Sequence, residues 1–265
     1  MIALVGDTEI AFDDIGSGFP VVFLHGFPLN RTMWEPQVTA LVGEFRCITI
    51  DMRGFGGSGK GTPPYSVDRY ADDVAGVLDT LGIERAVIAG LSMGGYVAFA
   101  LWRRHRDRVR ALVLADTRAV ADTVEVVERR RELIEAAEEK GATAVANMQI
   151  AGLVGRTTRD KRPDIYDAMH RMIAQASVGG IIGATEALIA RPDSTSTLST
   201  IDVPTLIIVG EEDVITPLKD ARRMQAAIVG SRLEVLKGAG HLSNVERPAA
   251  FNTVMTEFLG TLLYN

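Results

Sequence analysis

Short, mainly apolar runs recur along the chain, at residues 20–24, 45–50, 84–89, 109–114, 203–209 and 232–236. Runs of this length that lack alternation are typical of strands buried on both faces of a parallel sheet. Segments with helical spacing separate most of them; one begins at Ser66, which can cap it, and ends at Gly82. Residues 2–5 and 8–14 are predicted as a hairpin joined by a Gly6-Asp7 turn. The alternation predicts an α/β fold with a mostly parallel, doubly wound sheet.

One long segment differs from this alternation. From about residue 119 to 190 no strand-like run occurs, and helix-forming residues dominate. Residues 124–140 carry an apolar stripe at helical spacing, and the charged residues beside it are interpreted as a solvated face. We therefore expect a core formed by residues 1–118 and 191–265, with a helical cap inserted at 119–190.

Composition and charge narrow the possible partners. The 265 residues suffice for one large domain with an insertion. The net charge is −6 and no stripe of Lys and Arg is present, so nucleic acid is not expected as a partner. No apolar run approaches the roughly 20 residues that span a bilayer, and residues 1–6 lack the basic start of a signal peptide. We expect no membrane association and a cytoplasmic location.

The single cysteine, Cys47, excludes an internal disulfide and is expected in the core. It has no His, Asp or Glu at a spacing typical of metal ligands, so no zinc site is predicted.

The main candidate for chemistry is the stretch 87–96, in which an apolar run meets Gly90-Leu91-Ser92-Met93-Gly94 and then a helix-forming segment. This order of strand, sharp turn and helix holds a serine in a strained conformation with little room around it, and the two glycines supply that room. The Ser92 hydroxyl would project from the top of the sheet, at the positive end of a helix. The backbone N–H of Met93 would donate to an oxyanion. The pentapeptide alone occurs in many turns, so the interpretation depends on the predicted strand before it and the predicted helix after it.

A possible acid and base follow the serine in the chain. His241 lies in a loop beyond the last predicted strand, as a catalytic base should, whereas His105 and His170 fall in helical segments. Asp213 ends a Glu-Glu-Asp run just beyond the strand at 203–209, and at least some of these carboxylates must face water. A plain surface turn is the alternative for that run.

Two further loops follow buried strands. The first strand ends in His25-Gly26-Phe27, where the N–H of Phe27 is the candidate second donor to an oxyanion; the alternative is a simple turn. His25 is expected to brace this loop and is counted among the residues near the substrate. The glycine-rich loop 51–59 lacks the spacing of nucleotide loops, so Asp51 and Arg53 are expected to pin it to its neighbours.

Two clusters in the expected cap either line a substrate pocket or simply pack the helices. They are Met148 and Leu153 in one stretch, and Met169, Met172 and Ile173 in the other. Packing is the more common role of a single methionine. All five are retained as candidate substrate-binding residues.

Taken together, these features resemble the α/β-hydrolase fold family along the whole chain, with residues 119–190 in the place of the family's helical cap. Ser92, Asp213 and His241 match the family's nucleophile, acid and base in chain order. The similarity is greatest to bacterial carboxylesterases, enol-lactonases and cofactor-free haloperoxidase-type perhydrolases. It implies a serine hydrolase that cleaves small carboxylic esters through an acyl-enzyme, with an ester or lactone as its small-molecule partner. No metal or organic cofactor is implied.

Two alternatives stay open within this resemblance. One is an enol-lactonase or C–C bond hydrolase whose cap binds a carboxylate, for which Arg156, Arg159 and Arg191 are candidates. The other is a small-molecule sensor of the same fold, with an intact triad and slow turnover. The oligomeric state is not indicated by the sequence.

Overall fold

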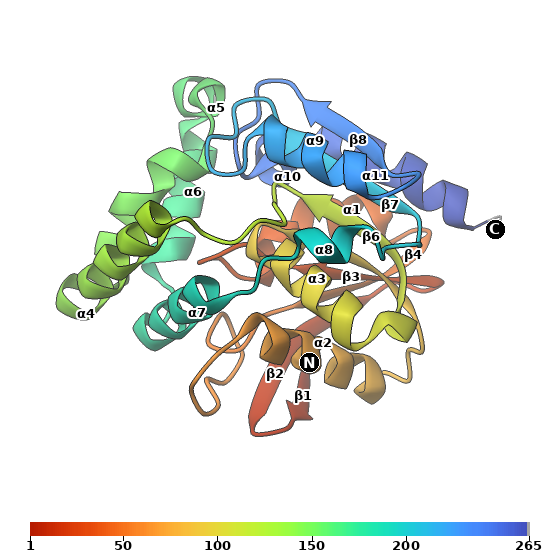
Figure 1. The fold of residues 1–265 in the computed structure, drawn as a ribbon, viewed down its shortest axis with the longest axis horizontal. Coiled ribbons are helices and arrows are strands. Elements are labelled where there is room, and N and C mark those ends of the chain that lie inside the picture. The colour runs from red at the N-terminus through yellow and green to blue at the C-terminus, as the bar shows by residue number, and fades with distance from the viewer. Residues whose placement is uncertain (264–265) are drawn as a thin grey trace.

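A twisted sheet forms the centre of the protein in the computed structural model, which describes residues 1–263 (Figure 1). Its strands are β1 (Ile2–Val5), β2 (Thr8–Ile15), β3 (Phe19–Leu24), β4 (Phe45–Ile50), β5 (Ala86–Leu91), β6 (Val109–Ala115), β7 (Thr205–Gly210) and β8 (Arg232–Leu236). They pair in the order β1-β2-β4-β3-β5-β6-β7-β8. β2 is antiparallel to β1 and to β4, and the other neighbours are parallel. The predicted α/β class, mostly parallel sheet and N-terminal hairpin are confirmed.

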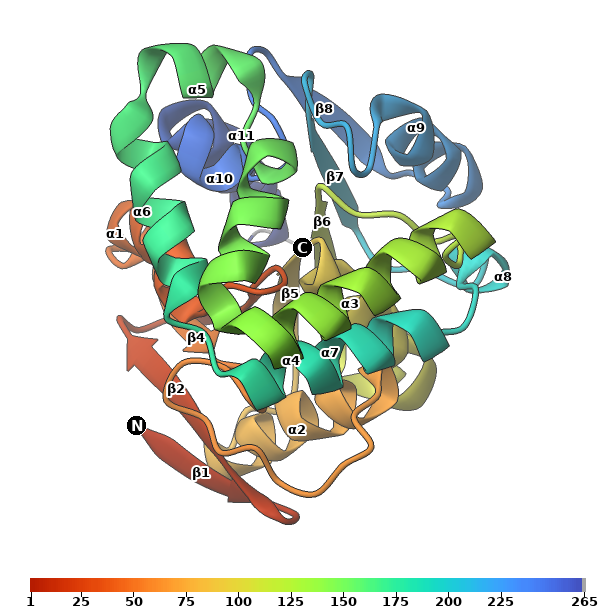
Figure 2. The same cartoon turned by 90° about the vertical axis from the view of Figure 1, so that its left-hand side faces the viewer.

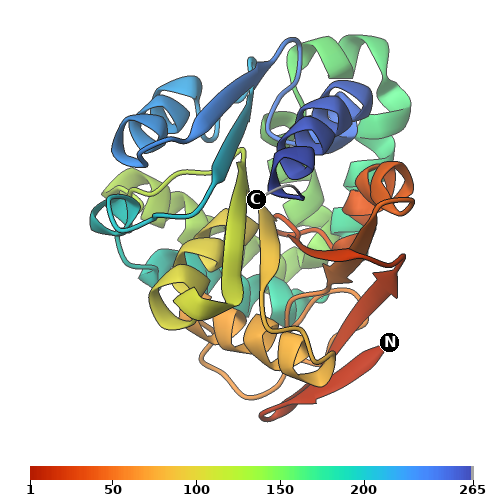
Figure 3. The same cartoon turned by 90° about the vertical axis from the view of Figure 1, so that its right-hand side faces the viewer.

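Helices cover both faces of this sheet (Figure 3). One face carries α1 (Glu35–Leu41) and α11 (Pro248–Leu262), and the other carries α2 (Val67–Thr80), α3 (Met93–Arg104) and α9 (Leu218–Ala227). The shorter elements are 3-10 turns at Arg31–Trp34 and Arg106–Arg108, and helices α8 (Thr195–Leu198) and α10 (Ser243–Glu246). Because both faces are covered, every residue of β5 and β7 is buried, as their continuous apolar sequences predict.

The helix α2 begins and ends where the sequence predicts. Ser66 accepts a hydrogen bond from the backbone N–H of Arg69 at 3.0 Å and so caps the first turn. Beyond the last turn Gly82 has a φ of 63°, a left-handed conformation that favours glycine. The buried face of α2, which includes Tyr70 and Val74, packs against α3 and helps to fix the helix that follows Ser92.

Between β6 and α8 the alternation gives way to four helices, which we call the insert: α4 (Val124–Leu153), α5 (Arg156–Lys161), α6 (Pro163–Ala174) and α7 (Val178–Ala190). In Figure 2 the insert faces the viewer; α4 and α7 run side by side, and α6 packs against α4. The helix predicted over 124–140 is present, and α4 breaks directly after it, at Gly141, whose φ is 74°. The insert thus consists of helices, as predicted, and contributes no strand to the sheet.

Within residues 1–263 no single helix is long and apolar enough to cross a membrane. The helices α6 and α7 pass that test only when counted together, and they meet at an angle of 95°. The same residues hold no group of three or more His, Cys, Asp or Glu side chains placed to bind a metal ion. Cys47 lies in the core as predicted, with a free thiol whose pKa burial raises to about 11.

Candidate active site

Ser92 lies at a sharp turn between β5 and α3. Its φ of 53° and ψ of −111° fall in a region that residues other than glycine rarely adopt. A Cβ at Gly90 would overlap the carbonyl of Gly94, and a Cβ at Gly94 would overlap the carbonyl of Leu24 in β3. The backbone N–H of Ser92 donates to the carbonyl of Ala115 at 2.9 Å. The two glycines are therefore required because backbone segments touch here.

Ser92, His241 and Asp213 form one hydrogen-bonded chain. Ser92 Oγ lies 2.8 Å from His241 Nε2, and His241 Nδ1 lies 2.8 Å from Asp213 Oδ2. Because an ionised carboxylate can only accept, Nδ1 carries the proton and Nε2 accepts from the Ser92 hydroxyl. Ser92 follows β5, Asp213 follows β7 and His241 follows β8. Their strands run parallel, so the sheet brings these loops to one edge.

Several donors hold Asp213 as an anion. Its Oδ1 accepts from the N–H groups of Ile215 and Thr216 at 2.8 and 2.9 Å, and its Oδ2 accepts from the Thr216 hydroxyl at 2.6 Å. Burial raises the pKa of Asp213, but the charge and hydrogen bond of His241, with the Thr216 bonds, bring that pKa below its ordinary value. In the same run Glu211 is exposed, as expected for part of it.

Burial and the neighbouring carboxylate shift the pKa of His241 in opposite directions. Burial lowers the pKa of His241, but the charge and hydrogen bond of Asp213 outweigh burial and raise that pKa above its ordinary value. The imidazole is 1% exposed, so this attraction acts in a site nearly free of solvent. His241 is therefore a stronger base than a free histidine.

A further buried carboxylate, Asp116, joins the loops that carry Asp213 and His241. Its Oδ1 accepts from the N–H of Gly210, three residues before Asp213, at 2.8 Å. Its Oδ2 accepts from the hydroxyl of Ser243, two residues beyond His241. Burial, and then the charge of Asp213, raise the pKa of Asp116 well above its ordinary value. Sequence reasoning missed this residue, although an acid directly after a buried strand was a signal for it.

The two candidate oxyanion donors, Phe27 and Met93, lie in backbone segments close to Ser92. Leu24 and Gly90 are opposite each other in β3 and β5, so the chain segments that leave these strands run together. A Cβ at Gly26 would lie 3.6 Å from the Cβ of Ser92. Phe27 and Met93 both line the cavity above Ser92, and within residues 1–263 no acceptor is recorded for either N–H. Both donors are thus available to a ligand.

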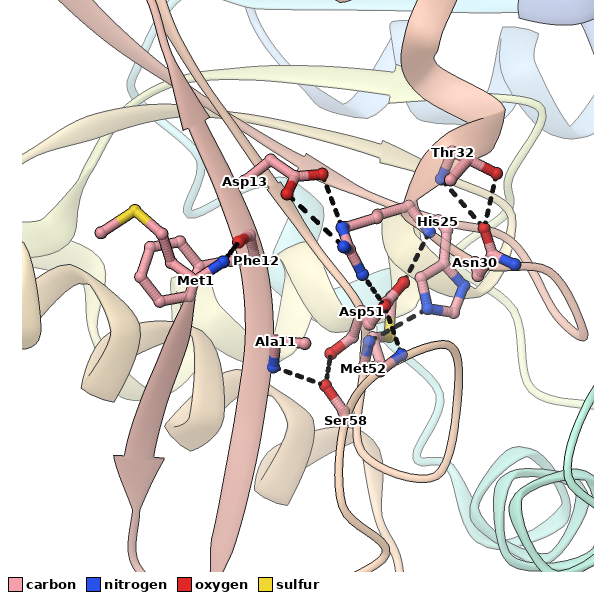
Figure 4. A network of polar contacts seen from close by, with 12 residues as sticks. Met1, Ala11, Phe12, Asp13, His25, Asn30, Thr32, Asp51, Met52 and Ser58 are labelled. Atoms are coloured by element: carbon pink, nitrogen blue, oxygen red, sulfur yellow. Dashed lines mark hydrogen bonds and ion pairs between the residues drawn. The ribbon is translucent and has the colours of Figure 1, made fainter.

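His25 lies beneath this loop. Its Nδ1 donates to the carbonyl of Gly26 at 3.0 Å. Its Nε2 accepts from the N–H of Met52, also at 3.0 Å (Figure 4). Burial lowers the pKa of His25, which keeps the ring in the neutral form that these bonds need. The expected bracing role is confirmed. The position of His25 does not support its assignment to the substrate-binding residues, because the side chain is fully buried and does not line the cavity.

The glycine-rich loop 51–59 surrounds the carboxylate of Asp51. Asp51 accepts from the N–H groups of Arg31 at 2.8 Å and Gly57 at 2.7 Å, and pairs with the Arg31 guanidinium. The Ser58 hydroxyl donates to the Asp51 carbonyl at 2.6 Å (Figure 4). Arg53 pairs with a buried aspartate of α2. The prediction that Asp51 and Arg53 pin this loop is confirmed.

A cavity of about 590 Å³ opens above Ser92 and His241. Its apolar lining includes Met148 and Leu153 of α4, as predicted, together with Leu133 of the same helix.

Met169, Met172 and Ile173 do not border the cavity. They belong to α6, which packs against α4, so their position favours helix packing, the alternative role, over substrate binding. The heptad-like spacing of apolar residues in α6 reflects helix packing.

The charged part of the cavity was also missed. Arg129 and Arg130 of α4 line it, with Arg118 of the loop after β6 and two cations of α9, Lys219 and Arg223. The charged residues of 124–140 are expected to form a solvated face, and most of them, including Arg129 and Arg131, are exposed. Arg130 differs, because its side chain is only 18% exposed and pairs with Asp122. The spacing of the charged residues in the sequence does not indicate which side of α4 faces the cavity.

Comparisons with known proteins agree with this geometry. Residues 20–248 match the model of the family described as alpha/beta hydrolase fold, and the chain belongs to that family. The 3-oxoadipate enol-lactonase 2 of Acinetobacter baylyi is 32% identical over 88% of this chain and 85% of its own length.

Solved structures give the same picture. A thermophilic esterase from Thermogutta terrifontis, with malate bound, is 40% identical and superposes with a TM-score of 0.93 over 96% of this chain and 94% of its own. The enol-lactonase of Burkholderia xenovorans is 31% identical, with a TM-score of 0.92 over 98% and 100% of the two chains. The protein is thus an α/β-hydrolase enzyme, and the predicted ester hydrolysis fits these relatives.

The hydrogen bonds from Asp116 to the loops of Asp213 and His241 lead to a stability prediction. Asp116→Ala leaves the Gly210 N–H and the Ser243 hydroxyl without their buried acceptor, and each such loss costs about 1–3 kcal/mol. We expect the free energy of unfolding in urea to fall by at least about 2 kcal/mol. Alanine at the exposed Asp107 is the control and should change it little.

Asp116→Asn tests the charge separately. Because the folded-state pKa of Asp116 is raised, ionisation costs stability as the pH rises, and asparagine does not ionise. The stability of Asp116→Asn relative to the native protein should therefore improve from pH 5 to pH 8. If the difference in stability between Asp116→Asn and the native protein is the same at pH 5 and pH 8, the raised pKa of Asp116 is contradicted.

Proposed function

We propose that the protein is a serine hydrolase of small carboxylic esters, with Ser92 as nucleophile, His241 as base and Asp213 as the acid that orients the base. The observation that carries this proposal is the pair of 2.8 Å hydrogen bonds that joins the three side chains beneath a cavity. Nucleophile, base and orienting group at such distances are the arrangement that activates a serine.

Acylation begins when Ser92 Oγ attacks the ester carbonyl while His241 Nε2 takes the hydroxyl proton. Asp213 keeps the imidazole in the tautomer with a proton on Nδ1 and stabilises the imidazolium that forms. His241 then donates its proton to the departing alkoxide, which leaves as an alcohol. Water, activated by the same histidine, attacks the acyl-enzyme and releases the acid and free Ser92.

The N–H groups of Phe27 and Met93 stabilise the oxyanion of each tetrahedral intermediate. One such donor is worth about 3 kcal/mol in the transition state. Met93 is the first residue of α3, so its N–H also lies at the positive end of a helix. His25 has a positioning role, because it holds the Gly26 carbonyl and with it the segment that ends in Phe27.

A lactone is the second candidate substrate. Two relatives, 31% and 32% identical, are named enol-lactonases, and they match nearly the whole chain. The same steps open a lactone, except that the alkoxide stays attached to the acyl group. The insert acts as the cap in either case, because α4 and α7 contribute to the walls of the cavity.

The first test is covalent labelling. A fluorophosphonate should add a single adduct at Ser92, seen by intact mass and peptide mapping, because His241 activates this hydroxyl alone. Ser92→Ala should lose both the adduct and the turnover of p-nitrophenyl esters, while alanine at the exposed Ser199 changes neither. Esterase activity retained in Ser92→Ala would refute the proposal, and a burst followed by almost no turnover would favour the sensor.

The pH dependence tests the base. Acylation needs neutral His241, and the pKa of His241 is raised, so kcat/KM should fall on the acid side with a midpoint above pH 6.5. Asp213→Asn removes the charge that raises this pKa; the midpoint should move down while the rate drops roughly a thousandfold or more. His170→Gln, which changes an exposed histidine of α6, should leave the profile unchanged. A midpoint that does not move in Asp213→Asn would contradict the pairing.

Substrate length tests the cap. Each methylene that enters the apolar part of the cavity should contribute up to about 0.8 kcal/mol, until the walls are reached. We expect p-nitrophenyl acetate to butyrate to be the best substrates, with a steep loss by octanoate. Met148→Ala should shift the optimum to longer chains, because Met148 lines the cavity, whereas Met172→Ala should not. A preference for decanoate in the native enzyme would mean an open acyl groove.

A further inference from the structure

One side of the cavity is strongly cationic, although the chain as a whole has a net charge of −6. The cations come from three separate parts of the chain: Arg118 after β6, Arg129 and Arg130 of α4, and Lys219 and Arg223 of α9. Asp220 is the carboxylate that lines the cavity with them, and it lies 3.6 Å from Arg223. A concave wall that carries mostly charges of one sign concentrates the field that it produces.

The centre of this wall is a cluster of three guanidinium groups around one carboxylate. Asp122 Oδ1 accepts from Arg118 at 2.7 Å and from Arg191 at 2.7 Å, and its Oδ2 accepts from Arg130 at 2.6 Å. The side chain of Asp122 is 1% exposed, and those of the three arginines are between 2% and 18% exposed. Burial raises the pKa of Asp122, but the three arginines lower it below its ordinary value, so Asp122 is ionised at neutral pH.

Three guanidinium groups against one carboxylate leave this cluster with a net charge of +2. Its hydrogen-bonding capacity is also unfilled: the buried Nε atoms of Arg118 and Arg191 have no partner within residues 1–263. Arg130 uses its Nε on Asp122, and no partner is recorded there for its two terminal nitrogens. Buried cations that are incompletely paired cost free energy, which an added anion would recover.

The cluster reaches the site of reaction through the cavity. Arg118 and Arg130 line the same cavity as Ser92 and His241. Arg191 stacks on the ring of Tyr96, 4.2 Å from its centroid, and Tyr96 also lines the cavity. Of the arginines considered from the sequence, Arg156 and Arg159 belong to α5 and do not border the cavity, and Arg191 supports the wall without lining it.

We propose that this wall is an anion subsite, and that the preferred substrate carries a carboxylate in addition to the ester or lactone that Ser92 attacks. Guanidinium groups bind carboxylates through paired, charge-assisted hydrogen bonds, so Arg118 and Arg130 are the specificity-determining residues. Arg129 and Lys219 add to the attraction at the rim. The inference rests on the proposed function, since it specifies the substrate of the same site.

The test compares two substrates with the same p-nitrophenyl ester, mono-p-nitrophenyl adipate and its methyl ester, which differ in the charge of the far end and by one methyl group. With the native enzyme the anion should have the higher kcat/KM by roughly 10- to 100-fold, the range that a charge-assisted hydrogen bond supplies. Arg130→Gln should lower this preference roughly tenfold or more. The matched control is Arg131→Gln, its neighbour on α4, which is 59% exposed and pairs with Glu128; there the preference should stay the same.

Binding separates the subsite from catalysis. Calorimetric titration of adipate into Ser92→Ala should show binding that Arg130→Gln weakens; if Arg130→Gln does not fold, Arg129→Gln at the rim serves in both measurements. Equal kcat/KM for the two esters, with turnover that depends on Ser92, overturns the anion subsite and leaves the proposed function standing. A preference that survives both arginine changes overturns the assignment to this wall. Turnover that persists in Ser92→Ala overturns the proposed function, and adipate binding then still decides the subsite.

Discussion

The strained backbone of Ser92 is the constraint on which the rest of the site depends. A non-glycine residue at a φ of 53° costs about 1–3 kcal/mol, so the surroundings must hold it in place. They do so by close backbone packing of Gly90 and Gly94, and by hydrogen bonds to both polar groups of the Ser92 backbone. The N–H donates to Ala115 and the carbonyl accepts from Thr117 at 2.8 Å. These contacts require neighbouring parallel strands, which is why the conformation of Ser92 depends on the sheet.

Around that serine, the protein concentrates titratable groups where water is scarce. Asp213, Asp116 and His241 are all at most 5% exposed, and the loops that carry them follow three adjacent strands, β6, β7 and β8. Asp213 acts on His241 directly, whereas Asp116 holds the two loops at a fixed separation. Acid–base chemistry and loop geometry are therefore coupled: a change in one carboxylate alters both the pKa values and the positions of the others.

The cavity combines an apolar side with a cationic side. The apolar side, from residues such as Leu133 and Met148, suits an acyl or alkyl group, and the cationic side is centred on Asp122 and its three arginines. The helix α4 contributes to both, since successive residues of a helix point in different directions. An α/β hydrolase can thus keep one reaction at the sheet edge and set its substrate preference through the insert and α9.

Much of this protein is determined by local sequence. Continuous apolar runs identify buried strands, and the glycines around Ser92, with Asp213 and His241 in loops after strands, point to the catalytic chemistry. These signals are local because strand periodicity, turn chemistry and chain order are local properties. Which side of a helix faces the cavity is decided by packing between segments far apart in the chain. For that reason Met169 and Met172 looked equivalent to Met148, and Arg130 looked as solvated as its neighbours on α4. The contacts of Asp116 and of the arginines around Asp122 became visible only once the tertiary structure had brought them together.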